Sequence, residues 1–243
     1  MKNDNKVLIM AHRGASSIAP ENTLKAFQKA IELNADYIEF DIYKSKDGEF
    51  VIWHDIAFSQ KDGETSFIKD MILANLKKID IGEGETFTTL QELIELTKGK
   101  IGLNCEIKAQ NIGKDVVGIL KKENLTETTI LSSFIFNELV SIKKLDSTLK
   151  VGLILTKDMI SPRWVTKFCK KAINNNFFAI HPYWRVINKD IVEFAHSNGL
   201  LVNIWTYIYE PIKDSDLREV VKMGIDGLIH DDIQQAKRVI RVD

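Results

Sequence analysis

The first quarter of this 243-residue chain gathers residue types that suit the cleavage of a phosphate ester. His12 and His54 supply imidazoles, which can accept or donate protons near neutral pH. Arg13 carries a planar fork of N–H groups that matches two phosphate oxygens. Glu39 and Asp41 add two carboxylates at alternate positions. Together these groups supply proton transfer, a phosphate clamp and the beginning of a divalent-metal site.

The carboxylates fall on one face of two expected strands, residues 37–43 and 101–107. Side chains alternate between the two faces of a strand, so Glu39 and Asp41 point the same way. Glu106 holds the equivalent position on the second strand. We therefore expect three carboxylates to meet inside the fold, at the carboxyl ends of the strands.

Such a cluster needs positive charge. At separations of about 4 Å and an effective dielectric near 20, each pair of carboxylates repels by roughly 4 kcal/mol. An all-oxygen ligand set suits one hard divalent cation, Mg²⁺ or Ca²⁺ and also Mn²⁺, rather than zinc. The alternative is a salt-bridge cluster with Lys108 and Arg13. We favour the metal site.

Several neighbouring residues have two interpretations. Asp55 either orients an imidazole or ends a hairpin. Thr23 suits a helix cap, whereas Glu21 and Asn22 are candidates to support the site. His181 ends an apolar strand pattern, where it is as suited to packing as to lining a pocket.

Short apolar runs alternate with helical patterns along the whole chain, which predicts strand–helix units around a parallel sheet. Eight such units in this length favour a closed (β/α)8 TIM barrel over an open doubly wound sheet. No Gly-x-Gly-x-x-Gly turn follows the first strand to support an open sheet. The expected strands are residues 7–11, 37–43, 101–107, 129–133, 151–155, 177–181, 201–205 and 227–230. The expected helices are residues 21–33, 90–97, 116–122, 137–145, 164–172, 191–197, 217–222 and 233–240.

The connection after the second strand is long for a barrel loop. Lys46-Asp47-Gly48 before an apolar run signals a hairpin, which would carry His54 over the barrel mouth. We expect a cap insertion at about residues 44–87 within one domain spanning residues 1–243.

Composition excludes several classes of protein. The chain has 33 basic and 34 acidic residues, which argues against a nucleic-acid protein that relies on a basic surface. We see no secretory signal and no apolar run long enough for stable membrane insertion. Two cysteines give no disulfide framework. These features predict a soluble, cytoplasmic protein, and nothing in them decides its oligomeric state.

The order of the motifs resembles that of the glycerophosphodiester phosphodiesterases over nearly the whole chain. The resemblance implies a (β/α)8 barrel that cleaves glycerophosphodiesters to glycerol 3-phosphate and an alcohol. The motifs are His12-Arg13-Gly14, Pro20-Glu21-Asn22-Thr23, Glu39-Phe40-Asp41, His54-Asp55, Glu106-Ile107-Lys108, Ser132-Ser133-Phe134, Trp205-Thr206 and Asp226-Gly227. The residues that the resemblance assigns are Glu39, Asp41 and Glu106 for the metal, His12 and His54 for acid–base catalysis, and Arg13, Lys108 and Trp205 for the substrate.

The chain departs from the family pattern near its last strand, where His230-Asp231 replaces the usual Thr-Asp pair. Two other functions stay open. One is hydrolysis of lipid-chain phosphodiesters such as lysophospholipids, with Phe58, Phe67 and Ile68 forming an acyl groove. The other is a non-catalytic sensor of a phosphate ligand. The sequence also leaves open the metal, the alcohol, the pathway, and whether water or a neighbouring hydroxyl attacks. For the general base we slightly favour His54.

Overall fold

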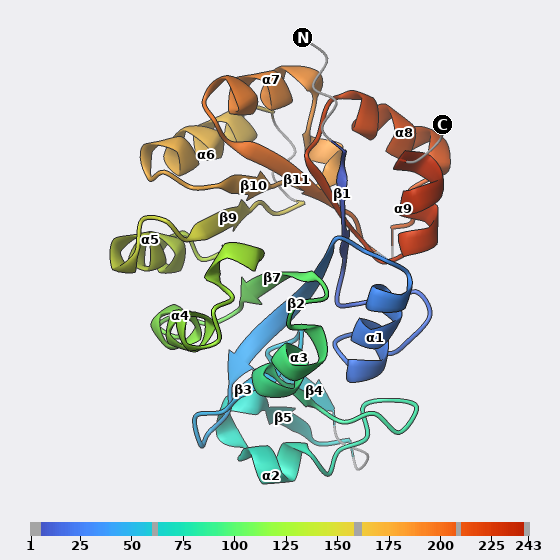
Figure 1. Ribbon diagram of the computed structural model, residues 1–243, viewed down its shortest axis with the longest axis vertical. Helices are drawn as coiled ribbons and strands as arrows, with labels where there is room; N and C mark the ends of the chain where they lie inside the picture. The colour runs from blue at the N-terminus through green and yellow to red at the C-terminus, as the bar shows by residue number, and fades with distance from the viewer. Residues whose placement is uncertain (1–5, 60–62, 158–161, 208–209, 241–243) are drawn as a thin grey trace.

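Eight parallel strands form a closed barrel in the computed structural model, which describes residues 6–59, 63–157, 162–207 and 210–240. Strand β1 pairs with both β12 and β2, and these two pairings close the barrel. The predicted (β/α)8 barrel is confirmed (Figure 1). The barrel strands are β1 (Leu8–Ala11), β2 (Tyr37–Lys44), β7 (Gly102–Ile107), β8 (Thr129–Ser133), β9 (Lys150–Ile154), β10 (Ala179–His181), β11 (Leu201–Trp205) and β12 (Gly227–His230).

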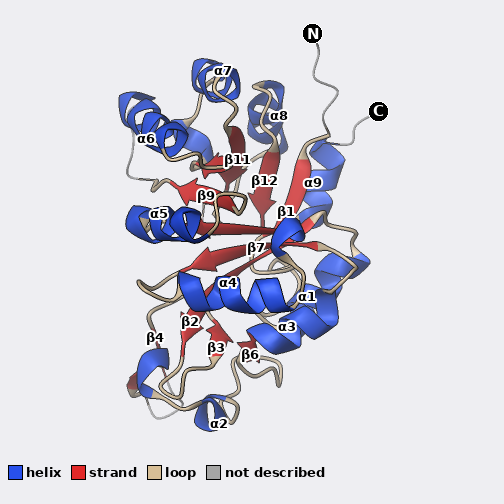
Figure 2. Cartoon of the chain, turned by 60° about the vertical axis from the view of Figure 1, so that its left-hand side comes forward, coloured by secondary structure: helices blue, strands red, loops and turns tan. Residues whose placement is uncertain are grey.

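Helices cover the outside of the strands, as Figure 2 shows. The sequence explains where the first of them begins: Thr23 accepts a hydrogen bond from Ala26 N and caps α1, as predicted. Phe27 of that helix is fully buried and packs edge-on against Phe40 of β2, with ring centroids 6.4 Å apart. The barrel helices are α1 (Leu24–Glu32), α3 (Leu90–Thr97), α4 (Gly113–Lys122), α5 (Phe136–Leu145), α6 (Pro162–Asn174), α7 (Lys189–Ser197), α8 (Asp214–Lys222) and α9 (Ile233–Ile240). Short 3-10 helices lie at η1 (Ile68–Asp70), η2 (Thr126–Thr128) and η3 (Trp184–Val186).

The long connection after β2 folds as an insertion at one end of the molecule, below the barrel in Figure 1. The predicted hairpin is present, because β3 runs antiparallel to β2. Rings of Trp53, Phe58 and Phe87 form a core within the insertion, with centroids 4.9–6.3 Å apart. Its elements are β3 (Phe50–Ile52), β4 (Ala57–Ser59), β5 (Thr65–Phe67), α2 (Leu73–Leu76) and β6 (Thr88–Thr89).

This core overturns the suggested acyl groove. Phe58 is 8% exposed and Ile68 is 1% exposed, and both belong to the buried core of the insertion. Only Phe67 of the three keeps a partly open side chain, at 37%. These three side chains therefore do not form an open groove together.

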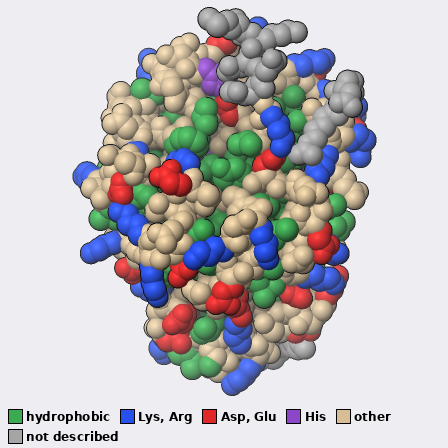
Figure 3. Space-filling view, in the orientation of Figure 1, with side chains coloured by type: hydrophobic (Ala, Val, Ile, Leu, Met, Phe, Trp, Pro, Cys, Tyr) green, Lys and Arg blue, Asp and Glu red, His purple; other side chains and the backbone are tan. Residues whose placement is uncertain are grey.

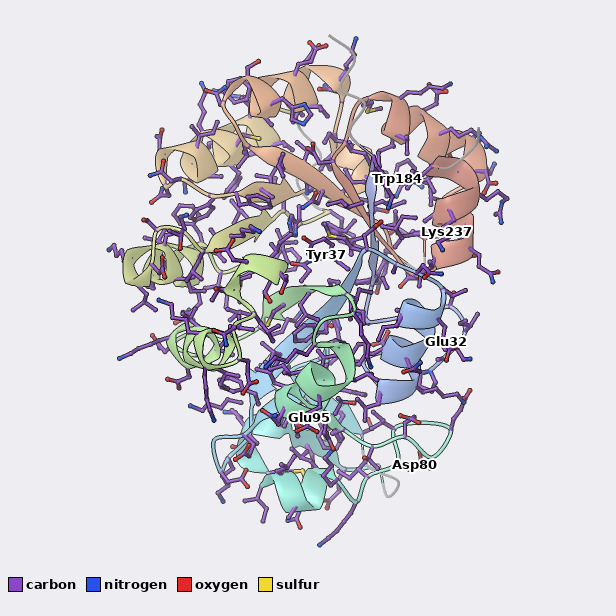
Figure 4. All side chains as sticks on the ribbon, viewed as in Figure 1. Glu32, Tyr37, Asp80, Glu95, Trp184 and Lys237 are labelled. Atoms are coloured by element: carbon purple, nitrogen blue, oxygen red, sulfur yellow. The ribbon has the colours of Figure 1, made fainter. Side chains whose placement is uncertain are left out.

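Inward-facing side chains fill the barrel. Tyr37, labelled near the centre of the view in Figure 4, packs its ring on Gly102, where an added Cβ would lie 2.5 Å from a ring carbon. On the outer surface, basic and acidic side chains are interspersed on the face seen in Figure 3, consistent with the balanced composition. No helix among the described residues is long and apolar enough to cross a membrane.

Candidate active site

Three carboxylates converge where β2 and β7 end. Asp41 and Glu106 are register partners across these strands, and Glu39 lies two positions earlier on β2. Oxygen atoms of the three residues all lie within 4.8 Å of one another. None of the three residues is more than 7% exposed. The side chains thus meet as the strand alternation predicts.

Burial and mutual repulsion change the acidity of this cluster. Burial, followed by repulsion from Asp41, raises the pKa of Glu39 to about 8. The same two causes raise the pKa of Glu106 to about 6. Burial also opposes ionisation of Asp41, but Lys108 and Arg13 outweigh it and hold the Asp41 pKa at about 2. Two of the three carboxylates therefore bind protons more tightly than usual, and a bound cation would reverse that preference.

Two basic side chains contact the carboxylates. Lys108 Nζ lies 2.8 Å from Glu106 Oε1 and 3.3 Å from Asp41 Oδ1. Arg13 Nε lies 3.4 Å from Asp41 Oδ2, and its Nη1 donates to both oxygens of Glu21 at 2.8 and 2.9 Å. The salt bridges of the alternative interpretation are thus present. Asp41 Oδ1 and Glu106 Oε1 share the single ammonium of Lys108 and accept no further hydrogen bond from the described residues, so each keeps capacity for another positive partner. Buried oxygens in this state fit a hard cation.

The loop after β1 takes an unusual backbone path to reach the cluster. Arg13 has a φ of 54° and Gly14 a φ of 83°, both in the left-handed region. This turn aims Arg13 N at Glu39 Oε2, 2.9 Å away. A side chain at Gly14 would place its Cβ 2.8 Å from the backbone of Ala26, so glycine is required there.

Asn22 adopts the same kind of conformation, with a φ of 59°. Its Nδ2 donates to Asp41 Oδ2 at 2.9 Å, and the residue is fully buried. A left-handed asparagine costs on the order of 1 kcal/mol, which the surrounding contacts must offset. Asn22 therefore fixes the orientation of a carboxylate rather than capping the following helix.

His12 follows β1 directly and is held by a carboxylate from the other end of the chain. Its Nδ1 lies 2.8 Å from Asp231 Oδ1, and its Nε2 lies 4.0 Å from Glu39 Oε2. Ser16 Oγ donates to the same Asp231 oxygen at 2.9 Å. Burial lowers the pKa of His12, but Asp231 and Glu39 outweigh burial and the net pKa is raised. Asp231 thus stabilises the charged imidazole and sets its orientation.

His54 comes from the insertion, as the hairpin pattern predicts. Its Nδ1 lies 2.7 Å from Asp55 Oδ1, although the Asp55 side chain is 69% exposed. Burial lowers the pKa of His54, and the positive charges of Arg13 and Lys108 lower it further, while Asp41 opposes them. The two candidate histidines therefore sit in opposite electrostatic environments.

Both histidines open into one cavity of about 200 Å³. Six of the eight expected site residues line it, while Asp41 and Lys108 belong to the carboxylate cluster beside it. Trp205 forms part of the wall, with its Nε1 donating to Leu155 O at 3.1 Å. The lining residues are His12, Arg13, Glu39, His54, Asn104, Glu106, Phe134, Ile154, Thr156, Lys157, His181, Trp205, Tyr207 and Ile229.

Three polar residues of the site, Asp231, Asn104 and His181, received no assigned role from the sequence. Asp231 is 219 residues from His12, and the two meet only because β1 pairs with β12. Asn104 shares a strand face with Glu106, which was a usable signal. His181 is fully buried and also lines the cavity, so the packing and pocket-lining interpretations of this residue both hold.

The buried state of His181 predicts a pH effect on stability. Burial lowers its pKa from 6.5 to about 3, so between these values the unfolded chain binds a proton that the folded protein does not. Stability therefore falls as pH falls below 6.5, and at pH 5 this one group contributes a loss of about 2 kcal/mol. Denaturant unfolding at pH 8 and pH 5 should show a pH dependence smaller by about that amount in His181→Gln. Identical pH dependence in the variant and the parent would contradict this assignment.

The assembled groups define a site for phosphate-ester chemistry. The carboxylate cluster, two candidate catalytic imidazoles and two basic side chains lie in or beside one cavity at the carboxyl end of a barrel, where TIM-barrel enzymes place their active sites. Cations can neutralise phosphate oxygens, and imidazoles can move protons to and from the reacting oxygens.

Comparison with known proteins agrees with this description. The model of the glycerophosphoryl diester phosphodiesterase family matches residues 12–235. The glycerophosphodiester phosphodiesterase of Caldanaerobacter subterraneus subsp. tengcongensis is 34% identical over 249 residues, which cover 97% of this chain and 98% of that protein.

Solved structures show the same likeness. An Oleispira antarctica phosphodiesterase in complex with the product sn-glycerol-3-phosphate is 26% identical, with a TM-score of 0.84 and 98% of each chain covered. The glycerophosphodiester phosphodiesterase of Thermotoga maritima is also 26% identical, with a TM-score of 0.80 over 96% of this chain and 98% of that one.

The fold and the match define a phosphoric diester hydrolase built on a (β/α)8 barrel. The chain belongs to the glycerophosphoryl diester phosphodiesterase family.

Proposed function

We propose that this enzyme hydrolyses glycerophosphodiesters to glycerol 3-phosphate and an alcohol with the help of one divalent cation. The observation that carries the proposal is the buried cluster of Glu39, Asp41 and Glu106 beside two histidines in one cavity. The product complex of the Oleispira antarctica relative supports glycerol 3-phosphate as the product.

The three carboxylates would hold the cation. Their donor set is all oxygen and suits Mg²⁺ or Ca²⁺, with Mn²⁺ as a third candidate. When bound, the cation supplies positive charge that stabilises the phosphate oxygens in the transition state. Asn22 and Lys108 hold the Asp41 and Glu106 carboxylates in place through the contacts described above.

His12 and His54 would divide the proton transfers. Asp231 is buried with His12 and stabilises its protonated form, which is the form that can give a proton to the departing alkoxide. The carboxylate that His54 contacts directly is that of the exposed Asp55, and solvent screens that contact. We therefore assign His54 as the base that accepts a proton from the attacking oxygen, and His12 as the acid.

Arg13 and Lys108 would bind the phosphate. Their guanidinium and ammonium groups already sit among the carboxylates, so positive charge is placed before substrate arrives. Trp205 provides an apolar wall against which the carbon skeleton of the glyceryl unit can pack.

The test is the release of glycerol 3-phosphate from glycerophosphoethanolamine and from glycerophosphocholine, with Mg²⁺ or Ca²⁺ and with EDTA. We expect release that EDTA abolishes and that either ion restores. Tight binding of both diesters without turnover would instead establish the sensor function. Turnover restricted to lysophospholipids would establish the lipid-chain activity. In an active preparation, a cyclic glycerophosphate caught by rapid quench would identify the neighbouring hydroxyl as the attacking group. If no cyclic product forms and ¹⁸O from labelled water enters the product, water is the attacking group.

A further inference from the structure

Uncharged polar side chains from four barrel strands lie in the interior of the barrel. Asn104, Ser132, His181 and Asn203 come from β7, β8, β10 and β11, and none is more than 1% exposed. Asn104 and His181 line the cavity, whereas Ser132 and Asn203 are not part of its wall. We call Asn104 and His181 the polar floor of the cavity.

The polar floor carries hydrogen-bonding atoms without partners. Asn104 Oδ1 and Nδ2 both lack a hydrogen bond among the described residues, and so does His181 Nδ1. Native proteins satisfy most of their buried polar atoms, so three such atoms on two residues that line one cavity are available to a ligand that enters it. One amide oxygen, one amide N–H₂ and one imidazole nitrogen offer both donors and acceptors.

Two glycines within strands make room for these side chains. A Cβ at Gly152 of β9 would lie 2.5 Å from His181 Nε2, and one at Gly227 of β12 would lie 2.6 Å from Asn203 Oδ1. Glycine weakens a strand, so its presence at two interior positions suits a need for space. His181 Nε2 also lies 3.2 Å from Asn203 Nδ2, which fixes the ring and leaves Nδ1 available. The polar floor is thus built into the barrel.

The ligand chemistry follows from charge. Burial keeps the imidazole of His181 neutral, because its pKa falls to about 3. Asn104 is neutral as well, so the polar floor offers no net charge to an ammonium or phosphate group. A neutral hydroxyl, which both donates and accepts, matches these atoms. The charged phosphate would instead meet Arg13, His12 and His54, which line the same cavity.

We propose that Asn104 and His181 form a hydroxyl-binding subsite that holds the terminal hydroxyl of the glyceryl unit, and that this subsite selects glycerol esters. The inference rests on the proposed function, because it places the reacting phosphate at the carboxylates. A site that hydrogen-bonds a substrate hydroxyl rejects the analogue without it by large factors. The polar floor therefore determines specificity, while the chemistry stays with the carboxylates and the histidines.

The test compares glycerophosphoethanolamine with its 2-hydroxypropyl analogue, which lacks only the terminal hydroxyl and keeps the neighbouring one. We expect the parent enzyme to favour the glyceryl substrate in kcat/KM by on the order of 10²–10⁴-fold. Asn104→Leu should reduce that ratio to below about 10 while leaving kcat/KM for the analogue within a few-fold. His181→Leu should act in the same direction.

Ser132→Ala is the matched control, because Ser132 Oγ is also buried and unpartnered but does not line the cavity. Ser132→Ala should keep the full kcat/KM preference for glycerophosphoethanolamine over its 2-hydroxypropyl analogue. Thermal unfolding separates specificity from folding: Asn104→Leu removes two unpaired polar atoms, so its Tm should be equal to or above that of the parent. A parent enzyme that turns over both substrates equally, or an Asn104→Leu enzyme that keeps the ratio, would overturn the subsite and show that ordered water satisfies these atoms.

A binding measurement keeps this test separate from turnover. Calorimetry with glycerol 3-phosphate and 2-hydroxypropyl phosphate should show tighter binding of the former to the parent and equal binding to Asn104→Leu. If the parent binds with this preference but hydrolyses neither diester, the proposed function fails and the subsite stands. If the parent hydrolyses glycerophosphoethanolamine but shows no preference, the subsite fails and the proposed function stands.

Discussion

Replacing His12 by alanine is expected to lower kcat by roughly 10²–10⁴-fold, which is the usual contribution of a positioned acid or base. His54→Ala should lower kcat by a comparable factor. The expectation rests on the placement of both rings in the cavity wall, with His12 held by Asp231 at 2.8 Å. Steady-state assays with saturating divalent cation measure the loss directly.

His196→Ala is the matched control. His196 also bonds a carboxylate, with its Nε2 2.8 Å from Asp226 Oδ2, but it belongs to the outer helix α7 rather than the cavity. Its removal should leave kcat unchanged. Near-normal turnover in His12→Ala would remove His12 from the mechanism.

Asp231→Asn tests the assigned role of His12 without deleting the ring. Asp231 raises the pKa of His12, so the amide should shift the basic limb of the pH–rate profile to lower pH. The sign follows because a general acid must carry its proton, and a lower pKa means that it loses the proton earlier as pH rises. A profile that keeps its basic limb while kcat falls would indicate a purely structural role for Asp231.

Strand periodicity predicted the barrel and the carboxylate cluster because both follow from local rules. Glu39 and Asp41 alternate with apolar residues on β2, and the same pattern on β7 brings Glu106 beside them. Hairpin signals also placed His54 correctly, since a two-strand turn is a short-range structure.

Two kinds of contact could not be predicted by such local rules: those between distant strands, and those that depend on an unusual backbone conformation. Asp231 meets His12 only through the pairing of the last strand with the first, which no local pattern encodes. Arg13 and Glu21 are eight residues apart, and their bidentate contact depends on left-handed backbone at Arg13 and Asn22. Left-handed asparagine is recognisable afterwards, but asparagine also suits caps and turns.

The polar floor shows a different limit of prediction from the sequence. A single histidine or asparagine in an apolar strand is usually explained by packing, and packing was one of the two interpretations that the sequence offered for His181. They become a site only when β7, β10 and β11 are placed around one interior and the partners of each atom are known. Hydrogen-bond satisfaction is a property of the folded molecule, so it cannot be read from any one segment of the chain.

Glu39→Gln is expected to abolish cation-dependent activity and at the same time to stabilise the metal-free protein. Glu39 is a buried carboxylate that Asp41 repels, and its pKa is raised to about 8. Because the folded pKa lies above the ordinary 4.5, ionised Glu39 destabilises the fold increasingly as pH rises between these values. A neutral amide removes that penalty, so at pH 8 without divalent ions we expect a gain of at least about 1 kcal/mol, or ~2–4 °C in Tm. Loss of the ligand should lower kcat/KM by at least about 10²-fold.

Glu138→Gln is the matched control for this expected gain in stability with loss of activity. Glu138 is also a buried carboxylate, but it accepts hydrogen bonds from the backbone N–H groups of Asn111 and Gly113 at 2.8 and 2.7 Å. An amide there replaces an acceptor by a donor, so stability should fall while activity and its dependence on divalent cation stay normal. Divalent cation should raise the Tm of the parent and of Glu138→Gln but not that of Glu39→Gln. A lower Tm in metal-free Glu39→Gln would show instead that Glu39 is a structural acceptor for Arg13 N, and the repulsion among the carboxylates would then no longer argue for a cation.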